Sequence, residues 1–381
     1  MRPLRVGLLV PGFSASEDDW CLPYALDLVR ELARIDDVRV FALRHPPLRE
    51  RYRVFGAEVI TFGDDGGRIR SRLGRWRSIL GTIRAEHRRR PFDVLHGLWA
   101  HEPGALAVAA GRLIGAPAVV SILGGELVHL PALGYGHRPL SAARLLTHLS
   151  LRGADGVTAL SRFSLRGIGP QIDQGRVEVF PFGIDRRLFF PGPAPRLEGE
   201  PALLNVSSLV PVKGHADLLE ALARLGRERP GAVLHLVGDG PLRAALEARS
   251  ARSDLRGRVR FHGEIRHDAL PAVYRGADLF VLSSWSEGQC VVAAEAIACG
   301  LPVAGTAVGI LPEIVAPAHL APPGDPAALA RAVGEALDGT RAISEDLFRR
   351  GNGFTLPESV ERWREVYSRA AGRRSGRPVL P

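Results

Sequence analysis

The sequence predicts an α/β protein made of two Rossmann-like domains, each built on a doubly wound parallel sheet. Three observations support this fold class: short apolar runs alternate with helix-period segments, this rhythm occurs twice, and a stretch rich in proline separates the two occurrences. Strand–helix alternation of this kind is typical of parallel sheets covered by helices. A length of 381 residues suits two domains that each bury a core.

The first occurrence of the rhythm covers residues 1–183. A helix is expected from about Pro23 to Ala33, and further helical stretches lie between the expected strands. These strands are Val6–Val10, Val38–Leu43, Glu58–Phe62, Val94–Leu95, Ala118–Leu123 and Gly156–Ala159.

Residues 184–201 are expected to be a linker, because the chain from Phe180 to Pro201 contains five prolines and no periodicity. The rhythm then restarts over residues 202–356, and a last amphipathic, basic helix (357–371) and a disordered tail (372–381) are expected to follow. The expected strands are Ala202–Val206, Val233–Val237, Val259–Phe261, Leu279–Leu282 and Pro302–Ala304, and the expected helices are Ala216–Leu225, Leu242–Arg249, Ala269–Tyr274 and Val291–Cys299.

The composition is that of an ordinary globular protein, with 46% hydrophobic and 24% charged residues. The formal charge of +9 favours anionic partners, of which phosphate groups and acidic lipids are expected and nucleic acid is not. Three cysteines without metal-ligand spacing suit reduced thiols. Because the N-terminus does not resemble a signal peptide and no apolar stretch is long enough to span a bilayer, a cytoplasmic location is expected.

The segment from Ser283 to Val303 carries the strongest functional signal. A strand ends in small polar residues, Glu287 and Gly288 form a turn, and a helix is expected to begin near Gln289. A helix N-terminus preceded by glycine offers N–H groups and a positive dipole end to an anion. The helix is apolar nearly all round, so Glu295 is expected to be buried or in a cleft, where an unpaired carboxylate is costly and a ligand-binding role is favoured.

Glu287 and Glu295 are separated by eight helical steps, or roughly 12 Å. That distance matches the span from a sugar ring, across a diphosphate, to a ribose. Each carboxylate is then placed to accept hydrogen bonds from paired hydroxyls, with the N–H groups facing the phosphates between them. The alternative is that Glu295 is an ordinary exposed residue of a helix.

Lys213 is the single lysine among 50 basic residues, the rest being arginine. A compact ammonium fits close to a phosphate where a planar, larger guanidinium does not. Lys213 precedes Gly214 and follows a predicted strand, a position typical of phosphate binding. The alternative is a surface lysine on a loop.

Two further segments of the second domain are candidates. The motif Gly238-Asp239-Gly240-Pro241 follows a strand; its glycines permit a tight turn, which either borders the ligand or simply starts the next helix. Base recognition is expected near Ile265, in the segment Phe261–Ile265, although no residue there selects one base over another.

The first domain offers glycine-containing loops after its strands. Gly12 follows the first strand and is expected to let the backbone approach a diphosphate, and Gly124-Gly125-Glu126 follows a later strand. His129, like His96 and His101, lies in a plausible loop, but a lone histidine is more often structural. The absence of G-x-G-x-x-G and of an acid ending the second strand argues against a dehydrogenase.

With these motifs assembled, the chain resembles retaining glycosyltransferases of family 4, in which two Rossmann-like domains face each other across a cleft (the GT-B fold). The resemblance covers nearly the whole chain. Its most specific motif is Glu287-x7-Glu295 followed by Ala298–Val303, and the segments Leu209–Gly214, Gly238–Pro241 and Pro181–Asp185 are similar to the family as well.

The resemblance implies a role for each part of the chain. Glu287 would contact the hydroxyls of the donor sugar, Glu295 would bind the ribose, and Lys213 would stabilise the leaving diphosphate. Residues 1–183 would bind the acceptor, residues 202–356 the nucleotide sugar, and the last helix would return to the first domain. No metal ion or other cofactor is expected. Backbone N–H groups of the donor site would come from Gly288, Gln289 and Cys290, with Val291 beside them.

Two positions depart from the family pattern. The family often has arginine five residues before the lysine, where this chain has Ser208, and histidine before the Gly-x-acid turn, where this chain has Leu123. By analogy with other donors that stabilise an anion, each loss would cost roughly 10²–10³-fold in rate. Ser208 can still donate one hydrogen bond, and another arginine can reach the diphosphate.

The sequence therefore predicts a metal-independent, retaining hexosyltransferase that uses a UDP- or GDP-sugar. Its acceptor is a glycan, a lipid or a small molecule. Two alternatives remain: a non-catalytic nucleotide-sugar-binding protein, suggested by the missing arginine and histidine, and a sugar-nucleotide epimerase of the same fold, which would convert the donor without an acceptor.

The run from Arg68 to Arg90 is dense in arginine, with apolar residues between the arginines. A basic amphipathic stretch of this kind predicts peripheral contact with an anionic membrane. The alternative is a solvated helix that packs through its apolar face.

Overall fold

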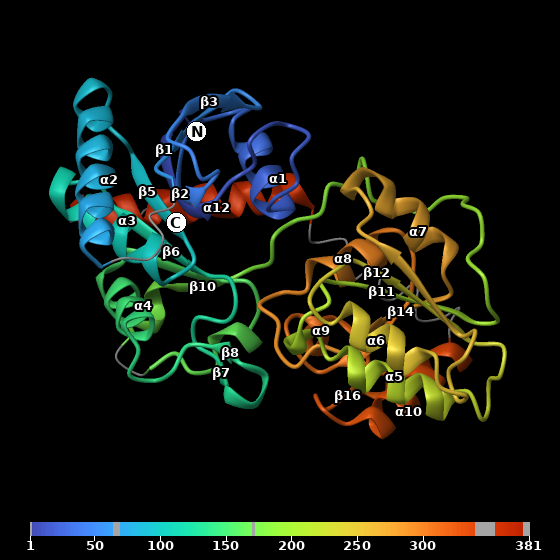
Figure 1. Ribbon diagram of the computed structural model, residues 1–381. Helices are drawn as coiled ribbons and strands as arrows, with labels where there is room; N and C mark the ends of the chain where they lie inside the picture. The colour runs from blue at the N-terminus through green and yellow to red at the C-terminus, as the bar shows by residue number, and fades with distance from the viewer. Residues whose placement is uncertain (1, 64–68, 170–171, 340–354, 376–381) are drawn as a thin grey trace. The chain divides into compact units, whose positions relative to one another are not determined.

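The computed structural model describes residues 2–63, 69–169, 172–339 and 355–375 (Figure 1). The chain divides into two compact units. The first comprises Met1–His129, Gly136–Gly183 and Leu356–Pro381, and the second comprises Leu130–Tyr135 and Ile184–Thr355. Each unit contains one sheet of mainly parallel strands, so the two predicted Rossmann-like sheets are confirmed.

The sheet of the first unit has the strand order β10-β9-β6-β5-β1-β2-β4-β3. Neighbouring strands are parallel except β3 and β4, which are antiparallel. The sequence analysis missed β3 and β10 because these edge strands are only four and three residues long and are partly exposed. The strands are β1 (Arg5–Gly12), β2 (Asp37–His45), β3 (Arg51–Val54), β4 (Ala57–Thr61), β5 (Val94–Leu98), β6 (Ala118–Ile122), β9 (Gly156–Ala159) and β10 (Val177–Val179).

Helices cover both faces of this sheet, and a two-stranded ribbon lies between β6 and α4 in chain order. The helices are α1 (Pro23–Leu32), α2 (Ile69–Arg89), α3 (Glu102–Ile114), α4 (Ala142–Gly153) and α12 (Leu356–Ser375), and the short 3-10 turns are η2 (Phe163–Leu165) and η3 (Gln174–Arg176). The ribbon strands are β7 (His129–Leu130) and β8 (Tyr135–Gly136), and the 3-10 turn between them, η1 (Pro131–Leu133), belongs to the second unit.

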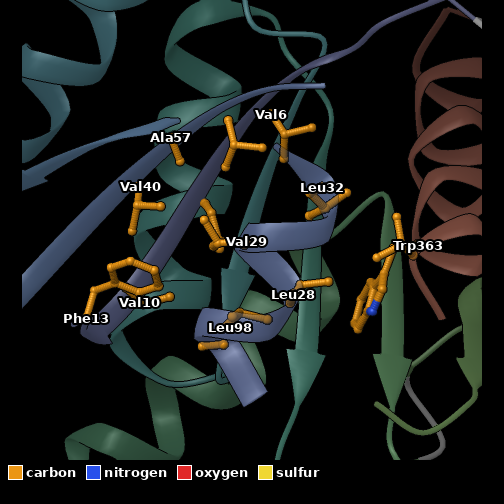
Figure 2. Packing of buried hydrophobic residues seen from close by; sticks show 14 of the residues in the cluster. Val6, Val10, Phe13, Leu28, Val29, Leu32, Val40, Ala57, Leu98 and Trp363 are labelled. Carbon is orange, nitrogen blue, oxygen red and sulfur yellow. The ribbon is translucent and has the colours of Figure 1, made fainter. Parts of the chain in front are cut away.

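The side chains of β1 alternate between two hydrophobic cores, as the period of a strand requires. Val6 and Val10 pack with Val29 of α1 in one core (Figure 2), whereas Leu9 packs with Ile83 of α2 in the other. Burial on both faces explains why β1 is one continuous apolar run in the sequence.

Trp363 of α12 is fully buried in the core that contains α1 (Figure 2). Its ring centroid lies 4.6 Å from that of His96 and 4.8 Å from that of Phe180. His96 donates or accepts hydrogen bonds at both ring nitrogens, to Tyr367 at 2.8 Å and to Ser121 at 2.6 Å. Burial lowers the pKa of His96 to about 3, so this imidazole is a neutral core residue.

The predicted disorder of the tail from residue 372 is wrong as far as Ser375, because α12 continues to that residue. Arg373 donates to the carbonyl oxygens of Asp155 and Gly175, and Arg374 donates to the carboxylate of Asp155. These tertiary contacts stabilise a helical turn that composition alone does not predict. Residues 376–381 lie outside the described residues.

The sheet of the second unit is entirely parallel and has the order β13-β12-β11-β14-β15-β16. Its strands are β11 (Ala202–Val206), β12 (Val233–Val237), β13 (Val259–Gly263), β14 (Leu279–Leu282), β15 (Val303–Thr306) and β16 (Leu320–Ala321). Its helices are α5 (His215–Leu225), α6 (Arg243–Ser250), α7 (Leu270–Gly276), α8 (Val291–Ala298), α9 (Leu311–Ile314) and α10 (Pro326–Asp338), with 3-10 turns η4 (Pro211–Lys213), η5 (His267–Ala269) and η6 (Pro317–His319).

Part of the segment 184–201 that was expected to be a linker is hydrogen-bonded within the second unit. The amide of Leu197 donates to the carbonyl of Gly276, and the amide of Glu200 donates to the carbonyl of Gly231. Glu198 also forms an ion pair with Arg260. Proline-rich composition therefore marks irregular backbone here, but that backbone has fixed partners.

Glu126 joins the loops that follow β5 and β6. Its side chain is 1% exposed and accepts hydrogen bonds from the amides of Ala100 (3.3 Å), Leu123 (3.0 Å) and Gly124 (2.6 Å). Burial outweighs these three bonds and raises the pKa of Glu126 to about 7. The carboxyl group is therefore a buried anchor between two loops that titrates near neutral pH.

We expect Trp363→Ala to lower the free energy of unfolding by about 3–5 kcal/mol, because it removes a large side chain from a packed core. Urea denaturation of the full chain measures this loss. Leu149→Ala on α4, where the side chain is 55% exposed, is the matched control and should change stability by at most about 0.5 kcal/mol. A loss below about 1 kcal/mol for Trp363→Ala would contradict the described packing of α12.

Glu126 should make stability depend on pH. Its pKa rises from 4.5 in the unfolded chain to about 7 in the folded chain, so the unfolded state releases the proton first as pH rises. Because the unfolded chain loses this proton at lower pH, the free energy of unfolding falls by about 3 kcal/mol as the pH rises from about 4.5 to about 7. Glu126→Gln removes this titration. Between pH 4 and pH 8 the free energy of unfolding of wild type should therefore fall relative to that of the variant. A constant difference would show that Glu126 ionises normally.

Candidate functional site

The candidate residues of the second unit follow strands at the point where the strand order changes direction. The chain runs from β11 outward to β12 and β13 on one side, and from β14 outward to β15 and β16 on the other. Ligands of open α/β sheets bind at the carboxyl ends of the strands beside such a switch. Lys213 ends η4, which follows β11, and Glu287 lies in the loop that follows β14.

Lys213 and Glu287 form an ion pair, with 2.6 Å between the lysine Nζ and the glutamate Oε1. Ser284 donates a second hydrogen bond to the same oxygen, also at 2.6 Å. The side chain of Lys213 is 26% exposed and that of Glu287 12% exposed, so the pair is partly buried and still reaches solvent. The structure therefore brings together the two residues that the sequence analysis placed in separate motifs.

The two loops that carry this pair are held together by several hydrogen bonds. The amide of Trp285 donates to the carbonyl of Val212 at 2.8 Å, and the hydroxyl of Ser283 donates to the carbonyl of Lys213 at 2.8 Å. The indole of Trp285 donates to the carboxylate of Asp217 at 2.9 Å. Gly214 has a φ of 65°, and a Cβ there would lie 2.0 Å from the carbonyl oxygen of Ser283, so only glycine permits this approach.

The ion pair keeps Lys213 charged. Burial by itself lowers the pKa of a lysine, but here the charge and the hydrogen bond of Glu287 outweigh burial and raise the pKa of Lys213 above its usual value. The ammonium is therefore a permanent positive charge at the switch point near neutral pH.

The helix predicted for Val291–Cys299 is confirmed as α8 (Val291–Ala298), and its start lies two residues after Gln289, near which it was also expected to begin. Cys290 has a φ of 77°, in the left-handed region that a right-handed helix excludes. The carbonyl of Gln289 accepts from the amide of Ile310, which holds this turn outside the helix. The estimate of 12 Å between the two glutamates, which assumed a continuous helix, therefore does not apply.

The first turn of α8 leaves some backbone amides without partners inside the helix. The carbonyl of Cys290 accepts from the amides of Ala293 and Ala294. Helix geometry leaves the first-turn amides without intrahelical partners, and those of Val291 and Val292 are the ones that remain at this end. Gly288, Gln289 and Cys290 precede the helix and are buried.

Glu295 is buried, as expected, with 4% exposure, but the premise that its carboxylate is unpaired is wrong. His267 contacts Oε1 at 2.9 Å, and the hydroxyl of Tyr274 donates to Oε2 at 2.8 Å. The argument that burial alone requires a ligand for Glu295 therefore fails, because two protein side chains already stabilise the carboxylate. His267 and Tyr274 lie 28 and 21 residues from Glu295 in the chain, and no sequence pattern connects them to it.

Gly238 brings the loop after β12 against the loop after β11. It has a φ of 123°, and a Cβ there would lie 2.1 Å from the carbonyl oxygen of Ser207. Ser208 is exposed beside this contact, and its carbonyl accepts from the amide of Val210. Asp239 accepts from the amide of Gly240 and from Arg243, the first residue of α6, so its side chain closes the turn and contacts the start of that helix.

Ile265 is partly buried in the loop after β13, two residues before His267. Because His267 contacts Glu295, the structure connects the expected base-binding segment with the second glutamate of the motif. That connection is a tertiary one, since the two segments come from different strand–helix units.

In the first unit, the strand order changes direction between β1 and β5. Gly12 ends β1, and the amide of the following Phe13 donates to the carbonyl of His45. Gly124 and Gly125 have φ values of 135° and 83° and surround the amide contacts of Glu126. His129 is exposed on β7, apart from that cluster of hydrogen bonds.

The other two histidine candidates have structural partners. His96 lies in the core beside Trp363, so a ligand-binding role for it is wrong. His101 caps α3 by accepting from the amide of Glu102 at 2.7 Å. Burial, followed by the neighbouring charge of His137, lowers the pKa of His101 to about 4. Both imidazoles are therefore neutral near pH 7.

The arginine-rich run forms α2, although Arg68 lies outside the described residues. Ile79 and Ile83 pack into a core, and Arg75 is buried in an ion pair with Glu102 at 3.2 Å. The apolar face of the helix is thus used in packing, while arginines on other faces, such as Arg84, are exposed. Among the helices in the described residues, none combines the length and hydrophobicity that crossing a bilayer requires.

Two family models match the chain. Residues 22–183 match the glycosyl transferase 4-like domain, and residues 190–349 match glycosyl transferases group 1. The first match ends at residue 183, where the first unit passes into the second, and the second match begins at residue 190, inside the segment 184–201.

Three curated relatives are glycosyltransferases from bacteria. A 2-deoxystreptamine N-acetyl-D-glucosaminyltransferase of Streptomyces fradiae is 32% identical over 394 residues, covering 92% of this chain and 92% of the relative. A 2-deoxystreptamine glucosyltransferase of Streptomyces kanamyceticus is 30% identical and covers 71% and 74%. A GDP-mannose-dependent phosphatidylinositol monomannoside mannosyltransferase of Mycobacterium tuberculosis is 32% identical and covers 57% and 58%.

Solved structures share the fold. Sucrose-phosphate synthase of Thermosynechococcus elongatus matches with a TM-score of 0.75 at 22% identity, covering 96% of this chain and 98% of that one. Anabaena HepE in complex with UDP and glucose matches with a TM-score of 0.74 at 19% identity, covering 96% and 99%. The chain therefore belongs to the family 4-like, group 1 glycosyltransferases and is a hexosyltransferase of this type with the GT-B fold.

Proposed function

We propose that this hexosyltransferase takes its sugar from a nucleoside diphosphate sugar and transfers it with retention of configuration. The observation that carries the proposal is the ion pair of Lys213 and Glu287 at the switch point of the second sheet. A charged ammonium held beside a carboxylate suits a ligand that presents a diphosphate next to a sugar ring.

Lys213 supplies the positive charge for the departing diphosphate. As the bond between the anomeric carbon and the phosphate oxygen breaks, negative charge develops on that oxygen. A preorganised cation stabilises this charge without reorganisation, which lowers the barrier. The amides of Val291 and Val292 face the same developing charge from the first turn of α8, whose dipole is positive at that end.

Glu287 accepts hydrogen bonds from hydroxyls of the transferred sugar in this proposal. Its ion pair with Lys213 and its bond from Ser284 fix the carboxylate in one position. The leaving phosphate takes the proton of the acceptor hydroxyl on the same face of the sugar, so no separate base is needed and the configuration is retained.

The donor base in this proposal is uracil or guanine. Support comes from the solved relative that holds UDP and glucose and from the relative named as GDP-mannose-dependent. The acceptor is proposed to be a small polyhydroxylated or amino-substituted ring. Support comes from two relatives named as transferases for 2-deoxystreptamine, which match 92% and 71% of this chain.

Lys213→Ala should lower the turnover number by about 10²–10³-fold, because the developing phosphate charge loses its cation. Release of UDP or GDP in the presence of acceptor measures turnover, and a thermal melt confirms folding. Lys213→Arg is the matched variant: it keeps the charge but not the compact shape, so activity should lie between wild type and alanine. Wild-type turnover in Lys213→Ala would remove Lys213 from the mechanism.

Chelation with EDTA should leave transfer unchanged, because Lys213 and the backbone amides provide the charge that a divalent cation supplies in other transferases. The rate with saturating donor and acceptor, measured before and after exhaustive dialysis against EDTA, checks this. Loss of activity that returns with Mg²⁺ or Mn²⁺ would overturn the metal-independent mechanism.

Donor consumption should require an acceptor. We expect UDP- or GDP-hexose to be converted when 2-deoxystreptamine or a related aminocyclitol is present and to persist when it is omitted. Product mass and anomeric configuration by NMR identify the reaction. Conversion of the donor without acceptor would indicate an epimerase, and binding without conversion across an acceptor panel would indicate a non-catalytic binding protein.

A further inference from the structure

Glu295 is held by two side chains from neighbouring parts of the second unit. His267 comes from η5 and contacts Oε1 at 2.9 Å, and Tyr274 comes from α7 and donates to Oε2 at 2.8 Å. The two donors thus take one position on each carboxylate oxygen. A carboxylate has about four acceptor positions, so this arrangement fixes the plane of the group and leaves half of its capacity for a ligand.

His267 and Tyr274 are themselves fixed by aromatic packing. Phe189 lies against both rings, with centroids 5.1 Å from His267 and 6.1 Å from Tyr274, and Phe280 lies 6.2 Å from Tyr274. His267 is 7% exposed and Tyr274 is fully buried. Neither donor can turn away from Glu295 without disturbing this packing.

Tyr274 acts only as a neutral donor. Burial, followed by the nearby charge of Glu295, raises the pKa of its hydroxyl well above the usual value. The proton of the hydroxyl therefore stays on Tyr274, which donates it to the carboxylate of Glu295 in a hydrogen bond. A negatively charged acceptor forms stronger hydrogen bonds with hydroxyl donors than a neutral one.

We propose that His267 and Tyr274 are positioning residues that orient Glu295, and that this orientation sets the preference of the protein for ribonucleotides over 2′-deoxyribonucleotides. The inference rests on the proposed function and extends it with the role that the family resemblance implies for Glu295, which is to accept hydrogen bonds from the ribose of the donor. Ile265, two residues before His267, places the expected base-binding loop next to the same carboxylate.

A purely structural role for this cluster has a different consequence. If His267 and Tyr274 only connect α7 to α8, their removal weakens the fold and lowers the affinity for ribo- and deoxyribonucleotides equally. If they orient Glu295 for a ribose hydroxyl, their removal lowers the affinity for the ribonucleotide alone. The ratio of the two dissociation constants therefore separates the two roles.

The experiment is isothermal titration of the full chain with UDP, GDP and ADP and with the 2′-deoxy form of each. For the nucleotide that binds, wild type should prefer the ribo form by about tenfold or more, the effect of one hydrogen bond to a charged group. Tyr274→Phe, which removes one hydroxyl, should reduce this ratio to about threefold or less. His267→Leu should reduce the ratio to the same extent. His267→Gln keeps a donor at the Nε2 position and should therefore show the wild-type ratio.

Tyr52→Phe is the matched control, because Tyr52 also donates one hydrogen bond, to the carbonyl of Ser14, but lies in the first unit. It should leave the ratio unchanged. Thermal melts of all variants show whether each is folded.

Glu295→Gln separates failure of this inference from failure of the proposed function. If it abolishes the preference while Tyr274→Phe and His267→Leu keep the wild-type ratio, the positioning role is overturned and the ribose contact stands. If Glu295→Gln keeps the preference, or if no nucleotide binds to wild type, the ribose contact itself is overturned and the positioning role with it.

Discussion

The ion pair between Lys213 and Glu287 is the interaction on which the candidate site depends. It joins the loops after β11 and β14, the two strands beside the switch in strand order, and it places a permanent positive charge there. Other contacts hold the same two loops together. The backbone of Gly214 lies close to the carbonyl of Ser283, and the amide of Trp285 donates a hydrogen bond to the loop that carries the lysine. The ion pair, the close backbone approach and the hydrogen bonds thus all fix the same two loops at the switch point of the sheet.

Three buried or partly buried glutamates are stabilised in three different ways. Glu287 has a cation, Glu295 has a histidine and a neutral tyrosine hydroxyl, and Glu126 has backbone amides. The amides do not offset the burial of Glu126, and its pKa rises to about 7. Each carboxylate lies in or after a loop that follows a parallel strand, where such a sheet concentrates its functional groups.

Membership of the glycosyltransferase family gives these loops a chemical context, and the departures from the family pattern become specific questions. Ser208 stands where the family often has arginine, and it is exposed beside the turn at Gly238. Leu123 lies where the family often has histidine, and its amide donates a hydrogen bond to the carboxylate of Glu126. In the proposed reaction, Lys213 and the amides at the start of α8 therefore provide most of the stabilisation of the leaving phosphate.

The sequence by itself determined the two sheets and most strand positions, and it singled out Lys213 and the segment from Glu287 to Glu295 as candidate site residues. These features follow from local periodicity, from glycine and proline positions, and from a single lysine in an arginine-rich chain, all of which are visible along the chain. Only the tertiary structure decided that Lys213 pairs with Glu287, that His267 and Tyr274 hold Glu295, that His96 is a core residue, and that the backbone of Cys290 is left-handed. The physical reason is that these facts depend on contacts between residues 21 to 271 positions apart, or on a backbone turn fixed by such a contact, and no local pattern encodes them.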